Sequence, residues 1–207
     1  IYSAMFNFGQ SLNSFHQKSI SEAVFKTNVV LEKIQKYIIF LQKYDVNNYS
    51  LEFISEALNE FSDMEYKTSI VKNLKGIDVR QILFNEQFQC CVMDPGKITK
   101  NFIEVDLARF IVTCRILYWG TFGILLKLKP NRRYEDNFMN GYKSSVSLSQ
   151  EALKIMIIKE FFKHWKMAHI SLDRKKWPKL FKLLLRKFYV DSFYKSLIAN
   201  ELRELSK

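Results

Sequence analysis

The sequence predicts an all-α protein: an irregular multi-helix domain of about seven helices around a central apolar helix at about 100–128. Three observations favour this fold. Only 6 glycines and 3 prolines occur among 207 residues, fewer than the usual roughly 7% and 5%, which leaves few turn formers for a β-sandwich. At 48% hydrophobic residues, the chain is too apolar to be disordered. Ser-x-x-Glu/Gln capping boxes at Ser19, Ser62 and Ser147 mark helix starts.

Apolar residues three and four positions apart predict the first helices. The Ser19 box begins a long amphipathic helix over about 19–45. A second helix follows, with Leu51, Ile54 and Leu58 on one face.

The next stretch mixes helix and turn signals. The Ser62 box opens a short helix that Gly76 closes, and Asp78 caps a further segment, of which residues 88–93 are equally compatible with an extended strand. Asp94-Pro95-Gly96 is the strongest turn signal in the chain.

The central apolar helix follows from Thr99 to about residue 128. Leu117, Phe122 and Leu125 are expected to be buried in it. Its most apolar stretch, 110–126, is shorter than the roughly 20 residues of a membrane-spanning helix, so a buried helix is favoured over a spanning one.

Residues 130–149 are rich in Asn, Ser and Arg and predict a mobile loop. A helix over about 149–169 comes next. Pro178 fits the first turn of a helix to about 190, and Asp191 is expected to cap the last helix, whose Tyr194, Leu197, Ile198, Leu202 and Leu205 point inward.

The helix after Pro178 is predicted to be amphipathic. Its buried stripe would consist of Leu180, Phe181, Leu184 and Phe188. Its basic side, facing solvent, would carry Lys179, Lys182 and Arg186.

These elements predict one domain with three parts. Residues 1–129 form a helical half of neutral net charge, 130–149 the mobile loop, and 150–207 a basic helical half packed on the first. The first residue is Ile1 rather than Met, which favours a module of a larger protein.

The positive charge is concentrated in one region. The chain has 32 basic and 21 acidic side chains, a net charge of +11. Residues 1–126 and 188–207 are each neutral, so the whole excess lies in 127–187. A one-sided field of this kind attracts an anionic partner, although a solvated lysine surface is the simpler alternative.

No catalytic, metal or cofactor motif is present, so the sequence predicts neither an enzyme nor a cofactor. The three cysteines, Cys90, Cys91 and Cys114, have no Cys-x-x-Cys spacing, which is typical of reduced thiols in an intracellular protein. Asp106 and Arg109, three residues apart, are explained by a salt bridge.

Cations and aromatic side chains alternate near the C-terminus, and these residues are the candidate partner-binding site. They are Lys163, Lys166, Arg174, Lys175, Lys176, Trp177, Lys179, Lys182, Arg186 and Lys187.

Three partners fit this pattern: an acidic protein, nucleic-acid phosphate and an anionic membrane surface. We predict a non-catalytic protein-interaction module that docks an acidic partner protein in a multi-subunit, chromosome-associated assembly, with a nuclear rather than cytoplasmic location. Direct binding of nucleic acid without sequence specificity is the alternative. Membrane-surface binding comes third.

Overall fold

The computed structural model describes residues 1–44, 46, 48–119, 132–143 and 147–206. It divides into two compact units. Unit 1 comprises residues 1–25 and 66–153, and unit 2 comprises residues 26–65 and 154–207. Each unit is assembled from segments far apart in the sequence, so this division differs from the predicted halves 1–129 and 150–207.

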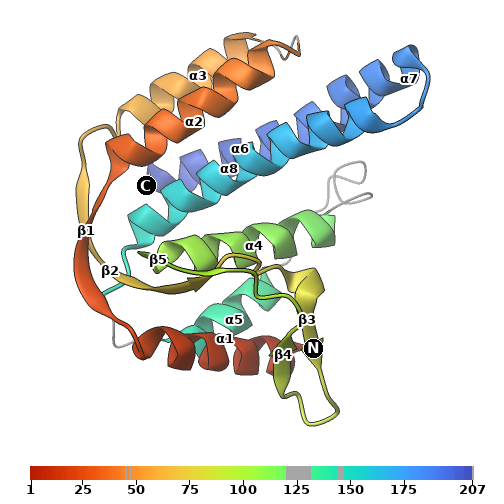
Figure 1. Ribbon diagram of the computed structural model, residues 1–207. Coiled ribbons are helices and arrows are strands. Elements are labelled where there is room, and N and C mark those ends of the chain that lie inside the picture. Colours follow the sequence, from red (N-terminus) through yellow and green to blue (C-terminus); the bar gives the residue numbers. More distant parts are fainter. Residues whose placement is uncertain (45, 47, 120–131, 144–146, 207) are drawn as a thin grey trace. The chain divides into compact units, whose positions relative to one another are not determined.

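Unit 1 combines helices with strands (Figure 1). Its helices are α1 (Tyr2–Gln17), α4 (Glu104–Trp119) and α5 (Arg133–Tyr142), with a short 3-10 turn η1 (Val79–Gln81). Its strands are β1 (Ser21–Lys26), β2 (Glu65–Leu74), β3 (Ile82–Phe84), β4 (Cys90–Val92) and β5 (Ile98–Phe102).

The strands form two small sheets, so the all-α prediction holds only as a mostly helical fold. One sheet has the order β1-β2-β5 and the other pairs β3 with β4. Strand β2 is antiparallel to β5, with Ile70 opposite Phe102 and Leu74 opposite Ile98. The extended alternative for residues 88–93 is confirmed at β4.

Two predicted capping boxes are wrong because sheet pairing replaces helix formation. The Ser19 hydroxyl accepts the N–H of Lys72 in β2, and the residues after it form β1. The Ser62 box precedes β2, whose Tyr, Thr, Ile and Val residues suit a strand. Thr99 lies in β5 rather than at a helix start.

The central apolar helix is confirmed for α4, which begins at Glu104 rather than at about residue 100; the predicted part from 120 to 128 lies outside the described residues. Leu107 and Phe110 are fully buried. Leu117, however, is 52% exposed, because the buried part of α4 ends near Thr113. Phe122 and Leu125 lie outside the described residues.

The predicted loop at 130–149 is wrong over residues 133–142, which form α5. Tyr134, Phe138 and Gly141 are four and three residues apart and share one face, a pattern that the polar residues between them hide. Phe138 is fully buried, with its ring centroid 4.2 Å from that of Phe110 and 5.6 Å from that of Phe8.

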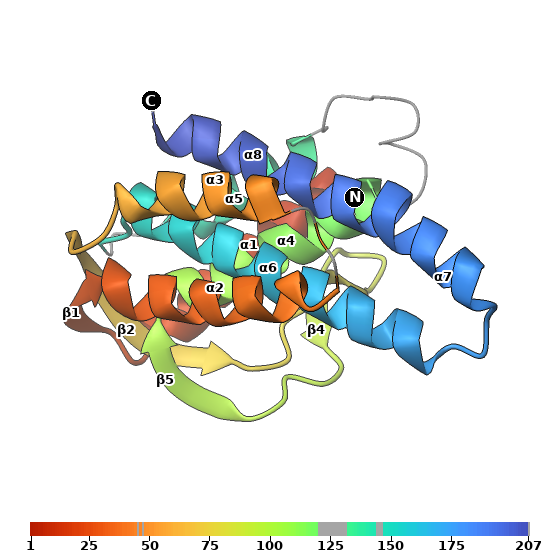
Figure 2. The same cartoon turned by 90° about the horizontal axis from the view of Figure 1, so that it is seen from above.

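Unit 2 consists mainly of helices. It contains α2 (Thr27–Gln42), α3 (Asn48–Asn59), most of α6 (Gln150–Arg174), α7 (Lys179–Leu184), the π-helical segment η2 (Leu185–Asp191) and α8 (Ser192–Leu205). Figures 1 and 2 show α6 running beside η2 and α8, with α7 at the far end of this hairpin, beyond the ends of α2 and α3.

Several unit 2 predictions are confirmed. Leu51, Ile54 and Leu58 of α3 are buried, as are Leu197 and Ile198 of α8. The predicted helix over 19–45 is confirmed only from Thr27, where α2 begins.

Candidate interaction surface

A sharp reversal of the chain separates α6 from α7. Lys175, Lys176 and Trp177 form the connection, and α7 begins directly after Pro178. A residue before proline is disfavoured in helical conformation, while the fixed φ of proline suits the start of a helix. Pro178 thus keeps Trp177 out of a helix and starts α7, which runs back along the hairpin with α6 (Figure 1).

Asp173, in the last turn of α6, holds the returning helix in place. Its carboxylate accepts a hydrogen bond from the Tyr44 hydroxyl (2.7 Å) and pairs with the guanidinium of Arg186. Its backbone carbonyl accepts a hydrogen bond from the Lys182 ammonium (3.0 Å). The hydrogen bond from Tyr44, together with the charge of Arg186, lowers the pKa of Asp173.

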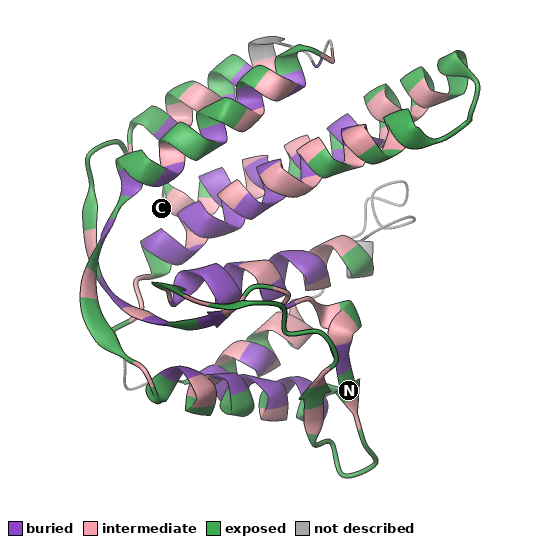
Figure 3. Cartoon of the chain, in the orientation of Figure 1, coloured by how far each residue is buried: buried purple, intermediate pink, exposed green. Residues whose placement is uncertain are grey.

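This arrangement turns the basic side of the helix toward Asp173 and the apolar side toward solvent. The predicted orientation is therefore wrong except at Lys179, which is exposed as predicted. Leu180 and Phe188, expected in a buried stripe, are each 68% exposed. Lys182 and Arg186, expected on the solvent side, are partly buried. In Figure 3 no part of α7 is coloured as buried.

The side chains exposed on and beside α7 are of two kinds. The apolar ones are Trp177, Leu180, Phe181, Leu183, Leu184 and Phe188. The cations are Arg174, Lys175, Lys176, Lys179 and Lys187. We call these eleven side chains the α7 surface.

Two aromatic contacts order one end of the α7 surface. The Trp177 and Phe181 rings meet edge to face, with centroids 5.5 Å apart. The ammonium group of Lys175 lies 6.0 Å from the Trp177 ring centroid, a cation–π arrangement. The Trp177 ring is therefore positioned by Phe181 and Lys175, and the residue is still 44% exposed.

The structure brings together six of the ten predicted site residues: Arg174, Lys175, Lys176, Trp177, Lys179 and Lys187. The other four have contacts within unit 2.

Lys163 pairs with Glu160 (2.9 Å), and Lys166 lies over the Phe40 ring at 4.8 Å. Lys182 and Arg186 bind Asp173.

The exposed leucines and phenylalanines were not predicted as site residues. The sequence does contain a signal for the region in which they lie: residues 174–190 contain seven cations and no acidic residue.

A buried polar cluster fixes the helix that follows α7. The carboxylate oxygen Oδ1 of Asp191 accepts the indole N–H of Trp165 (2.8 Å) and lies 2.8 Å from Nε2 of His169. Asp191 makes no side-chain cap to α8, which corrects its predicted role. The π-helical turn η2 brings Asp191 to these partners, and both Trp165 and His169 are fully buried.

Unit 1 contains a second buried polar cluster. Nδ1 of His16 lies 2.7 Å from the Tyr142 hydroxyl, and its Nε2 lies 3.2 Å from Oδ2 of Asp106. Asp106 also accepts the N–H of Leu74 (2.8 Å) and, as predicted, lies near Arg109 (3.7 Å). Since His16, Asp106 and Tyr142 are almost completely buried, this cluster links α1, α4, α5 and β2 rather than facing a substrate.

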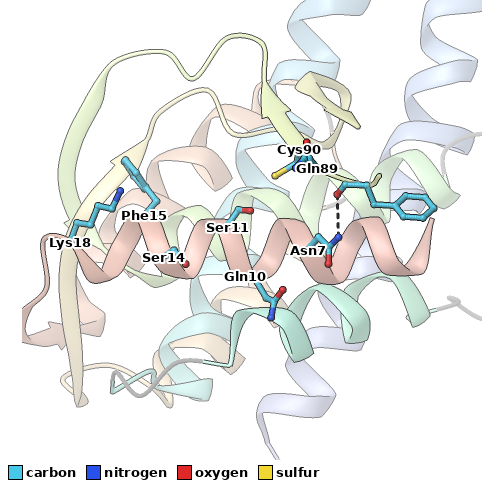
Figure 4. Close-up of a pocket in the computed structure, with 9 residues that line it drawn as sticks. Asn7, Gln10, Ser11, Ser14, Phe15, Lys18, Gln89 and Cys90 are labelled. Atoms are coloured by element: carbon cyan, nitrogen blue, oxygen red, sulfur yellow. Dashed lines mark hydrogen bonds between the residues drawn. The ribbon is translucent and has the colours of Figure 1, made fainter. Parts of the chain in front are cut away.

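An open groove of 640 Å³ also lies in unit 1, along α1 (Figure 4). Asn7, Ser11 and Ser14 line it from α1, with Gln89 and Cys90 on the other side. The Asn7 amide donates a hydrogen bond to the carbonyl of Phe88 (3.2 Å). Neutral polar groups dominate the lining, so the groove defines no particular ligand.

Comparison with protein-family models and with curated protein sequences finds no match. No group of three or more His, Cys, Asp or Glu side chains in the described ranges could hold a metal ion. None of the helices described is long and apolar enough to cross a membrane. The α7 surface is the best-defined candidate for function.

Proposed function

We propose that this protein is a non-catalytic interaction module that attaches to an anionic partner through the α7 surface. The observation that carries the proposal is the orientation of α7. Six large apolar side chains face water beside five cations, while Asp173 holds the opposite side of the helix.

Exposed apolar surface of this kind is typical of a binding site. Contiguous apolar patches on a protein surface, especially with polar rims, mark interaction sites. Trp and Arg, both present here, are enriched among residues that dominate binding energies. The cations add long-range attraction for a negative partner.

The partners considered from the sequence fit the surface unequally. An acidic protein of a multi-subunit assembly is the partner favoured by the sequence and would match the charge of the surface. An anionic membrane surface, the third alternative, would match both the charge and the exposed apolar side chains. Nucleic acid fits less well, because phosphate contacts are made by cations and six of the eleven exposed side chains are apolar. The chromosome-associated role and nuclear location stay predictions.

Partner capture from cell extract tests the proposal. In the α7-charge variant, Lys175, Lys176 and Lys179 are replaced by Glu. In the matched α2-charge variant, the exposed Lys33, Lys36 and Lys43 are replaced by Glu.

We expect the α7-charge variant to lose partners that the wild type and the α2-charge variant retain. Equal capture by all three proteins would contradict the proposal.

A further inference from the structure

The orientation of α7 also indicates which anionic partner the surface fits. Resting on the proposed function, we propose that the partner is an anionic membrane surface, on which α7 lies with its apolar side chains among the lipids. Had the leucines been buried as the sequence predicted, only a cationic face would remain. Their exposure moves the lipid surface from the third alternative to the first.

The charge pattern favours lipid over protein. Residues 174–190 carry seven cations and no acid, and four of the five exposed cations are lysines. Lysine is depleted at protein–protein interfaces, whose cores prefer arginine. Clusters of lysine and arginine beside an apolar helix face bind anionic lipid without a fixed pairing geometry.

The placement of the side chains fits insertion into a headgroup layer. On the helix, Leu180, Leu184 and Phe188 lie four residues apart and so share one face, and each is exposed. Lys179 and Lys187 are exposed beside them, and long lysine side chains can reach headgroups while their stems lie along apolar surface. Trp177 is a residue type enriched at membrane interfaces.

Within unit 2, α7 occupies a terminal position. It lies at the far end of the hairpin that α6 forms with η2 and α8, beyond α2 and α3 (Figures 1 and 2). The six apolar side chains of the α7 surface are each between 44% and 68% exposed. A deformable lipid surface can enclose such side chains without a preformed complementary pocket.

Vesicle flotation tests the inference with the whole chain. The probes are vesicles of phosphatidylcholine alone and of equal parts phosphatidylcholine and phosphatidylserine. We expect binding to the mixed vesicles only. The α7-charge variant should bind them at least roughly a hundredfold more weakly, because three lysines near an anionic surface are lost and three glutamates add repulsion, whereas the α2-charge variant should bind like wild type.

An apolar pair tests insertion separately from charge. The α7-apolar variant carries Leu180→Ser and Phe188→Ser, and its control carries Ile39→Ser and Phe53→Ser, which are 50% and 62% exposed on α2 and α3. Only the α7-apolar variant should lose vesicle binding. Tryptophan emission should shift to shorter wavelength on binding, and Trp177→Phe should remove that shift.

The outcomes separate this inference from the proposed function. If mixed vesicles do not bind, or bind the α7 variants and their controls equally, the lipid partner is wrong. If in that case the α7-charge variant still loses capture of an acidic protein or nucleic acid, the proposed function stands with that partner. If the α7 variants change no binding at all, both proposals fail.

Discussion

Arg186, in the π-helical turn η2, pairs with Asp173 in the last turn of α6. The Arg186 guanidinium also lies 5.0 Å from the centroid of the Tyr44 ring, whose hydroxyl binds the same carboxylate. One acidic side chain thus determines which side of α7 faces the protein. The exposure of the apolar side follows from these contacts.

Replacing Asp173 by Ala should loosen α7 more than it destabilises the protein. Since Asp173 is 45% exposed, its ion pair should contribute less than about 1 kcal/mol to the free energy of unfolding. Hydrogen exchange of amides in 179–191 should become faster. Glu52→Ala, an exposed acid of α3, is the control, and unchanged exchange in 179–191 would show that Asp173 does not hold the helix.

Removing the apolar side chains of α7 should leave stability intact. Leu180→Ser and Phe188→Ser remove side chains that are 68% exposed, so the free energy of unfolding should change by less than about 0.5 kcal/mol each. Leu197→Ala, at a site 4% exposed in α8, should cost about 2–5 kcal/mol. Urea denaturation measures both changes. A loss of more than about 2 kcal/mol in the free energy of unfolding from Leu180→Ser would mean that the apolar side of α7 is buried after all.

Glu160 should make the protein sensitive to acid. Burial raises the pKa of Glu160, but the ammonium groups of Lys159 and Lys163 outweigh it and lower the pKa from 4.5 to about 2. A lowered folded-state pKa adds stability above the unfolded-state value, which is lost as the pH falls toward about 2. The urea midpoint should therefore fall between pH 5 and pH 2 by more in the wild type than in Glu160→Gln.

Glu160→Gln should also be less stable than wild type at neutral pH, because two lysines lose their counter-charge. Glu52→Gln, at an exposed site, should keep the wild-type pH profile. Parallel profiles for Glu160→Gln and wild type would show that the buried carboxylate is not the acid-sensitive group.

Gly9 and Gly141 should be intolerant of a methyl group. A Cβ on Gly9 would collide with the Phe138 carbonyl, and one on Gly141 with the Phe6 carbonyl, because α1 and α5 meet backbone to backbone. Gly141→Ala should cost about 1–3 kcal/mol, although alanine is the better helix former. Asn140→Ala, at an exposed neighbour, should cost little, and equal thermal midpoints for the two variants would contradict the close approach.

The sequence by itself determined those helices whose pattern is contained in one short segment of the chain. The apolar faces of α3 and α8 repeat every three to four residues and were predicted with their buried residues. Pro178 marked the start of α7. The charge count located the region that carries most of the α7 surface.

Tertiary structure decided what depended on distant residues. The segments after Ser19 and Ser62 carry local helix-start motifs, but they form β1 and β2. Strand β2 lies between β1 and β5 in the sheet, and pairing with strands distant in the sequence overrides a capping box. The sequence pattern likewise did not determine which side of α7 faces solvent. Periodicity shows that a helix has an apolar and a basic side, but Asp173 and Tyr44, on other elements, attract the basic side and leave the leucines in water.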